Sequence, residues 1–77
     1  MKREISFMKY SITNQIRKLR FINDEMSQEH LANKTGVSRQ TINAIKQNKY
    51  SPSLELAFKI ALVFNKEIGE VFKYEKE

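Results

Sequence analysis

The chain has 77 residues, 40% of them hydrophobic, which is enough for one domain with one small core. It has no cysteine and a single histidine, His30, so disulfide bonds are excluded and an ordinary zinc site is not expected. The support that small domains often take from disulfides or metals should therefore come from self-association. No apolar run approaches the roughly 20 residues of a membrane span, and no cleavable leader is evident, so we expect a cytoplasmic protein.

The net charge of +5 is unevenly distributed. Residues 1–49 hold ten Lys and Arg against four acidic residues, whereas residues 50–77 hold four Lys against five Glu. The net charge is thus +6 in the first part and −1 in the second. This asymmetry favours one face for an anionic partner and another face for a different contact.

Five helices are predicted in chain order. The first spans 12–22, where Ile12, Ile16, Leu19 and Ile22 form one apolar stripe. A second spans about 28–35, capped by Ser27 and ended by Gly36, and a third spans about 39–47, capped by Ser38. The fourth spans about 54–64 after Ser53, and the last spans about 67–72.

Two of these helices have unusual faces. In the third, Thr41, Ile42 and Ile45 form a thin apolar edge opposite a wide polar face. The fourth is apolar nearly all round, so part of it should meet a partner chain.

The first ten residues do not fit the helical pattern. We assign 1–10 to an N-terminal arm or extension and 11–77 to the domain. The arm contains aromatic and β-favouring residues, so it is either a short strand, with the tail around 71–74 as its mate, or a disordered extension. Lys2 and Arg3 could reach an anionic partner from it.

Residues 27–49 contain two short helices, each opened by a serine, joined by a short turn with a glycine. This arrangement is typical of a helix-turn-helix, whose second helix enters the DNA major groove. On its outward side, Arg39 can bind guanine and Gln40 can bind adenine, both bidentately. Other outward residues could read bases by hydrogen bonds or by methyl contact with thymine: Asn43 and Gln47, and Thr41 and Ala44.

The segment SQEHLANKTGVSRQTINAIKQNKYSPSLELAFKIALVF resembles the Cro/repressor-type (XRE) helix-turn-helix regulators, and the resemblance covers roughly residues 12–74. It implies a compact, all-α bundle of about five helices that binds operator DNA as a two-fold dimer. By position, Gln28 matches a glutamine that bonds a phosphate and often the recognition helix. The loop after the third helix matches the one that grips the DNA backbone. The expected phosphate contacts are Gln28, Ser38, Lys46, Asn48, Lys49, Tyr50 and Ser51.

Two positions depart from the family pattern. A glutamate near the end of the third helix often pairs with an arginine of the first, but here these positions hold Lys46 and Arg20. The usual Asn-Gly-Lys after that helix is Gln47-Asn48-Lys49, so Asn48 should adopt the left-handed conformation that glycine would take.

We therefore predict a sequence-specific DNA-binding regulator, most simply a repressor, acting as a homodimer on a palindromic operator. The predicted dimer contacts are Phe58, Leu62, Val63, Phe72 and Tyr74, whereas Phe64 is assigned to the core. The alternative is an antitoxin-type or adaptor protein that binds another protein through the same apolar surface. No enzymatic activity, cofactor, metal or small-molecule ligand is expected, and His30 is interpreted as a surface residue of the second helix.

Overall fold

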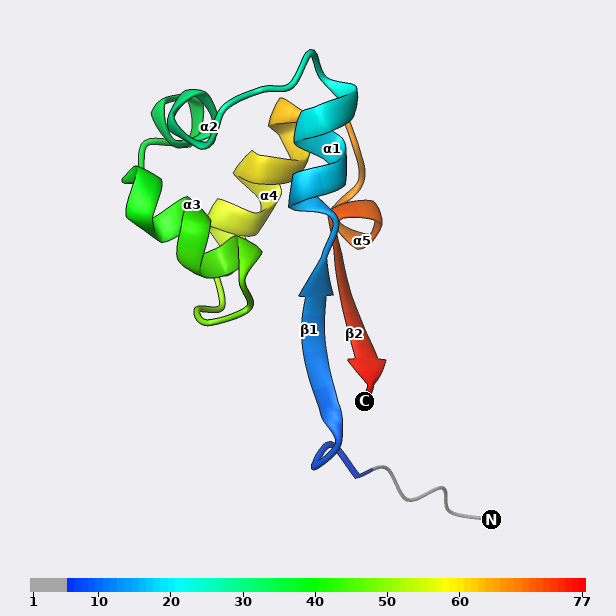
Figure 1. The fold of residues 1–77 in the computed structure, drawn as a ribbon. Coiled ribbons are helices and arrows are strands. Elements are labelled where there is room, and N and C mark those ends of the chain that lie inside the picture. The colour runs from blue at the N-terminus through cyan, green and yellow to red at the C-terminus, as the bar shows by residue number, and fades with distance from the viewer. Residues whose placement is uncertain (1–5) are drawn as a thin grey trace.

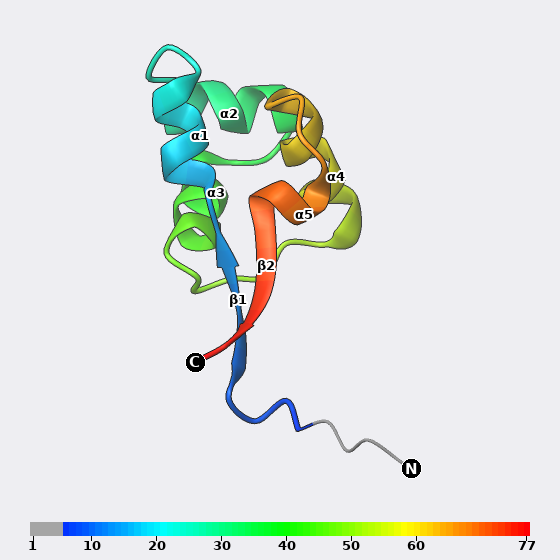
Figure 2. The same ribbon diagram turned by 90° about the vertical axis from the view of Figure 1, so that its right-hand side faces the viewer.

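The computed structural model describes residues 6–77, in which helices α1–α5 form a small bundle and a two-stranded ribbon extends away from it (Figures 1 and 2). Residues 1–5 of the predicted N-terminal arm, including Lys2 and Arg3, lie outside the described residues. The elements in chain order are β1 (Tyr10–Asn14), α1 (Ile16–Ile22), α2 (Gln28–Thr35), α3 (Arg39–Lys46), α4 (Leu54–Val63), α5 (Ile68–Val71) and β2 (Phe72–Lys76).

The predicted five-helix bundle is confirmed, and the ribbon adds a small antiparallel sheet to it. β1 pairs with β2 in a register that places Ile12 opposite Tyr74 and Asn14 opposite Phe72. The tail pairs as a strand, as one of the two alternatives for the arm expected. Its mate, however, overlaps the predicted arm only at Tyr10 and continues to Asn14. The ribbon continues into the bundle, where the Gln15 amide donates to the carbonyl of Val71 at 2.9 Å.

The first helix is correspondingly shorter than predicted. It begins at Ile16, since the segment with Ile12 and Thr13 is extended and pairs with β2. Ile16 and Leu19 are buried as expected, but Ile12 and Ile22 are 37% and 64% exposed and do not belong to the core stripe. The predicted end of this helix at residue 22 is confirmed, although the side chain of Ile22 is exposed. The predicted start was wrong, because an isoleucine spaced for a helix suits a strand equally well.

The other helices match their predicted positions to within a residue or two. Serine side chains cap three of them: the hydroxyls of Ser27, Ser38 and Ser53 accept from the amides of His30, Thr41 and Leu56. The predicted helix at 67–72 is reduced to four residues, because Phe72 already begins β2.

A left-handed residue follows each of α2, α3 and α4. Gly36 has φ 81°, Asn48 has φ 60° and Asn65 has φ 55°. After α3, the amide of Asn48 donates to the Ile45 carbonyl at 2.9 Å and that of Lys49 to the Ala44 carbonyl at 2.8 Å. This is a Schellman motif, which satisfies carbonyls that the helix end leaves free. The left-handed conformation predicted for Asn48 is confirmed.

One core joins all five helices. The largest fully buried side chains are Ile16, Leu31, Ile42, Ile45, Ile60 and Val71. Phe64 is buried among them, as predicted, while Met26, Val37 and Ile68 pack against their edge. Thr35 is the buried polar residue of the described chain, and its hydroxyl donates to the Leu31 carbonyl at 2.9 Å, so it is satisfied.

The two glycines test whether the left-handed turn after α2 requires glycine, because Gly36 lies in that turn and Gly69 does not. A methyl group at Gly36 or at Gly69 would meet no atom within 4 Å, so steric clash plays no part at either position. Gly36→Ala places a side chain at φ 81° and should destabilise the fold by about 1–2 kcal/mol. Gly69→Ala lies inside a helical turn and should be neutral or stabilise by up to about 1 kcal/mol. Urea unfolding of both variants measures the difference, and equal effects would contradict the role of Gly36.

Candidate nucleic-acid interface

Helices α2 and α3 form a helix-turn-helix unit in which both ends of the turn are fixed. Gly36 ends α2, and its amide and that of Val37 both donate to the Ala32 carbonyl, at 2.8 and 3.1 Å. Ser38 then caps α3: its hydroxyl accepts from the Thr41 amide at 3.1 Å and lies 2.9 Å from the Thr41 hydroxyl. The crossing of the two helices in Figure 1 therefore follows from a left-handed glycine and a serine cap.

Helix α3 is anchored along a narrow edge. Ile42 and Ile45 are buried completely or nearly so, while Arg39, Gln40 and Gln47 are exposed. Thr41, Asn43 and Ala44 are half-buried at the borders of this polar face. The six predicted base-reading residues thus lie on one helix or at its C-cap, directed mainly away from the core.

Gln28 reaches from the first turn of α2 to the middle of α3. Its Nε2 donates to the Oδ1 of Asn43 at 3.1 Å. The resemblance implied a bond from this glutamine to the start of the recognition helix, and here the bond goes to a residue one turn further in. The contact fixes both amide side chains at the junction of the two helices.

The loop after α3 follows the helix without a break in its hydrogen bonding. Asn48, Lys49, Tyr50 and Ser51 are all exposed, whereas Lys46 is half-buried at the helix end. This loop and the start of α2 supply most of the predicted phosphate contacts. Because the Schellman motif orders its first residues, the loop has a defined position relative to α3.

The charges around α3 are positive and largely unpaired. No acidic residue lies between Arg39 and Lys49 in the sequence. In the described part of the chain, Nε and Nη1 of Arg20 are buried without a hydrogen-bond partner.

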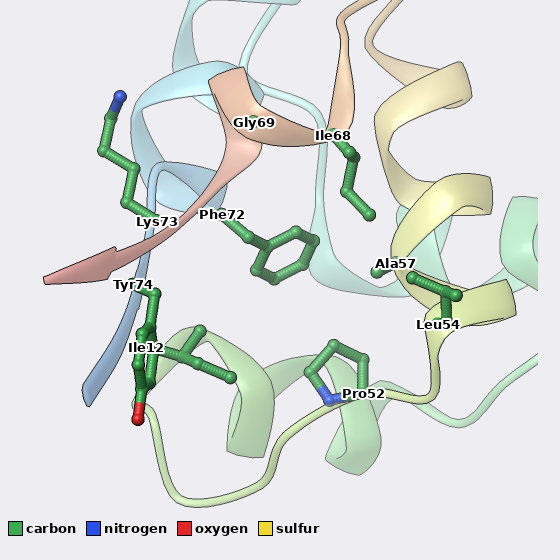
Figure 3. Close-up of a pocket in the computed structure, with 9 residues that line it drawn as sticks. All are labelled: Ile12, Pro52, Leu54, Ala57, Ile68, Gly69, Phe72, Lys73 and Tyr74. Atoms are coloured by element: carbon green, nitrogen blue, oxygen red, sulfur yellow. The ribbon is translucent and has the colours of Figure 1, made fainter. Parts of the chain in front are cut away.

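A second surface of different character lies on α4. Leu54, Phe58 and Leu62, spaced four residues apart, are 69%, 48% and 76% exposed. Beside them an open apolar groove of about 440 Å³ runs between α4, α5 and the ribbon, and Figure 3 shows Phe72, Ile12 and Tyr74 along it. Of the predicted dimer residues, Val63 and Phe72 also pack against the core, and Phe58 and Leu62 are exposed. Tyr74 is exposed on one side while its ring stacks on that of Tyr10 in the ribbon, with the ring centroids 5.4 Å apart. His30 is exposed on α2, as predicted.

Sequence reasoning missed Asn14. Its side chain connects the end of β1 to the end of α3, with Nδ2 donating to the carbonyl of Ile45 at 2.9 Å and to Oδ1 of Asn48 at 2.9 Å. The residue was placed inside a helix, where no such contact would arise. A polar residue just before a helical stripe is a cap signal that could have shortened that helix.

These features define a helix-turn-helix protein: two helices joined by this turn, a polar face of the second helix directed outward, and basic residues around that face. A helix-turn-helix family model matches residues 16–71. The chain belongs to this family, the XRE-type helix-turn-helix regulators, and it is a DNA-binding transcriptional regulator.

Similar proteins agree with this assignment. An uncharacterized HTH-type transcriptional regulator of Methanocaldococcus jannaschii is 58% identical over 52 residues, which are 68% of this chain and 79% of that protein. One from Bacillus subtilis is 47% identical over 51 residues, which cover 66% and 77% of the two chains. The solved structure of the transcriptional regulator VanUg, 23% identical, shares the fold with a TM-score of 0.74, covering 99% of this chain and 100% of that one. None of the helices among residues 6–77 has the length and apolar character to cross a membrane.

Proposed function

We propose that the protein binds a palindromic operator in double-stranded DNA as a homodimer and represses transcription from it. Each copy would insert α3 into the major groove, with the two half-sites about one helical turn (~34 Å) apart. The observation that carries the proposal is the outward face of α3, where amide and arginine side chains stand free beside a helix edge anchored by two buried isoleucines. A cytoplasmic location belongs to the same proposal.

Base reading is assigned to the exposed N-terminal half of α3. Arg39 and Gln40 occupy its first turn, the part of a recognition helix that approaches base edges. Their side chains have the fork geometry for guanine and adenine, respectively. Asn43 is oriented by Gln28, which would leave its amide nitrogen free to donate to a base. Thr41, Ala44 and Gln47 complete the reading face.

Phosphate binding is assigned to the two ends of the helix-turn-helix unit. Gln28 and Ser38 lie at helix N-termini, whose free amides favour anions. Lys46, Asn48, Lys49, Tyr50 and Ser51 form the other end. Such contacts hold the protein in register on the duplex, while the groove contacts provide sequence preference.

Dimerisation is assigned to the apolar surface of α4 and the ribbon. A single copy leaves Leu54, Phe58 and Leu62 open to water along one stripe, next to the groove in Figure 3. Burying one such side chain is worth about 1.5–3 kcal/mol, so a symmetric contact over the stripe would support a dimer. Among the residues that line the groove, Lys73 is the one charged side chain.

The same surface supports the second candidate, an adaptor or antitoxin-type protein that binds a different chain. The exposed stripe would then be covered by that chain, with DNA binding serving autoregulation. The two candidates differ in the oligomeric state of the isolated protein, since only the first requires self-association.

Selection of bound duplexes from a random pool tests the proposed function directly. Enrichment of a palindrome supports it. Recovery of no preferred sequence, with capture of one defined protein partner, would favour the adaptor candidate.

Gln40→Ala tests base reading on the selected duplex. Loss of a bidentate contact should reduce discrimination at one base position per half-site by about 1–3 kcal/mol and leave the other positions unchanged. Competition binding with singly substituted duplexes measures this. An unchanged sequence preference would exclude Gln40 from base reading.

Lys49→Ala tests phosphate binding. Affinity should fall for all sequences alike, and the slope of log affinity against log salt should flatten by about one phosphate. Lys66→Ala, which removes a lysine from the turn after α4, is the matched control and should leave the slope unchanged. If the two variants behave alike in the salt titration, Lys49 does not contact a phosphate.

Leu62→Glu tests the dimer surface. Leu62 is 76% exposed in the single copy, so the substitution should leave the monomer folded while weakening dimerisation by at least about 2 kcal/mol. Phe21→Glu is the control, because Phe21 is 70% exposed on α1, outside the stripe. Sedimentation velocity over a concentration series measures both. A wild-type monomer at every concentration, with and without DNA, would rule out the homodimer.

A further inference from the structure

The carboxamide of Asn14 is the polar connection between the ribbon and the DNA-binding unit. Nδ2 donates to the carbonyls of Ile45 and Lys46 at 2.9 and 3.3 Å, and to Oδ1 of Asn48 at 2.9 Å. Oδ1 accepts from the amide of Ile16 at 3.1 Å. One side chain therefore contacts the start of α1, the end of α3 and the loop that follows.

These contacts fall where α3 needs support. The last carbonyls of a helix lack partners within it. At the end of α3 the carbonyl of Ile45 accepts from the amide of Asn48 and also from Asn14, and the carbonyl of Lys46 accepts from Asn14. The chain then turns through Asn48 at φ 60°, a conformation that costs an asparagine more than a glycine. The bond from Asn14 to Asn48 offsets part of this cost and selects one rotamer of Asn48.

Within residues 6–77, the hydrogen bonds that join the ribbon to the end of α3 and its loop come from Asn14. A hollow of about 360 Å³ lies between them, lined on one side by Ile12 and Tyr74 and on the other by Tyr50 and Pro52. Because packing across this hollow is incomplete, the hydrogen bonds of Asn14 largely determine where the loop sits relative to β1.

We propose that Asn14 is a positioning residue for the DNA interface. It fixes the C-terminal end of α3 and the left-handed turn at Asn48, and it thereby places the phosphate-binding loop without touching DNA. The proposal rests on the proposed function of that loop. It also gives the ribbon a role, since a displacement of β1 would be transmitted to the end of α3 through a single side chain.

The first test uses the free, full-length protein. In Asn14→Ala, the amides of Asn48 and Lys49 should exchange with solvent about fivefold faster or more. A fivefold change in the opening equilibrium corresponds to the net contribution of about one hydrogen bond, which this substitution removes. Thr13→Ala is the matched control: Thr13 is the preceding residue on the other face of the ribbon, and it should leave both rates unchanged. Equal rates in wild type and Asn14→Ala would overturn the proposal.

The second test uses the selected duplex and a mixed-sequence duplex of the same length. Asn14→Ala should weaken binding to both by about tenfold, since the loop contacts phosphates irrespective of sequence. Thr13→Ala should bind as wild type does. Unchanged affinity in Asn14→Ala would overturn the proposal.

The third test separates positioning of the loop from general stabilisation. Asn48→Gly removes one of the three acceptors of Asn14, the side-chain oxygen Oδ1 of Asn48. Because glycine adopts the left-handed turn without strain, this substitution also keeps the double variant folded. In this background, Asn14→Ala should cost about threefold in affinity. An undiminished tenfold loss would show that Asn14 does not act through Asn48 and would overturn the proposal.

If wild type binds neither duplex, the proposed function fails, whereas the exchange rates still decide whether Asn14 holds the loop.

Discussion

In the described chain, helix α3 inserts two side chains fully into the core, Ile42 and Ile45, and its other residues stay exposed or half-buried. Two buried isoleucines fix the helix against translation but leave rotation and tilt to its ends. At one end, Gly36 and Ser38 determine the entry of the chain, and at the other, Asn48 determines the exit. The geometry of the DNA-binding face therefore depends on a few turn residues more than on the size of the core.

Local signals explain how much of this could be predicted from the sequence. Serine caps and Gly36 have short-range physical causes, and they located α2, α3 and α4 to within a residue or two. The ribbon depends on pairing between residues 58 to 66 positions apart (72 − 14 and 76 − 10), and no local pattern distinguishes Ile12 in a strand from Ile12 on a helix. The contact of Asn14 with α3 was missed for the same reason, because it exists only once β1 is extended.

The site residues are divided between two surfaces with separate physical requirements. In the proposed function, the polar face of α3 stays solvated until DNA replaces the water. Exposing the apolar stripe at Leu54, Phe58 and Leu62 to water is unfavourable, so burying it would stabilise the protein. Their separation agrees with the charge asymmetry of the sequence, since the basic excess lies before residue 50. The ribbon borders both surfaces, with Tyr74 beside the groove and Asn14 at the end of α3.

The most direct measurement is a map of backbone amide chemical shifts in the full chain as the selected duplex is added. We predict the largest changes at Gln28 and from Ser38 to Ser51, with small changes along α5 and the outer part of the ribbon. Largest changes along the stripe at Leu54, Phe58 and Leu62, with α3 unaffected, would contradict the assignment of α3 and its flanking turns as the DNA-binding face.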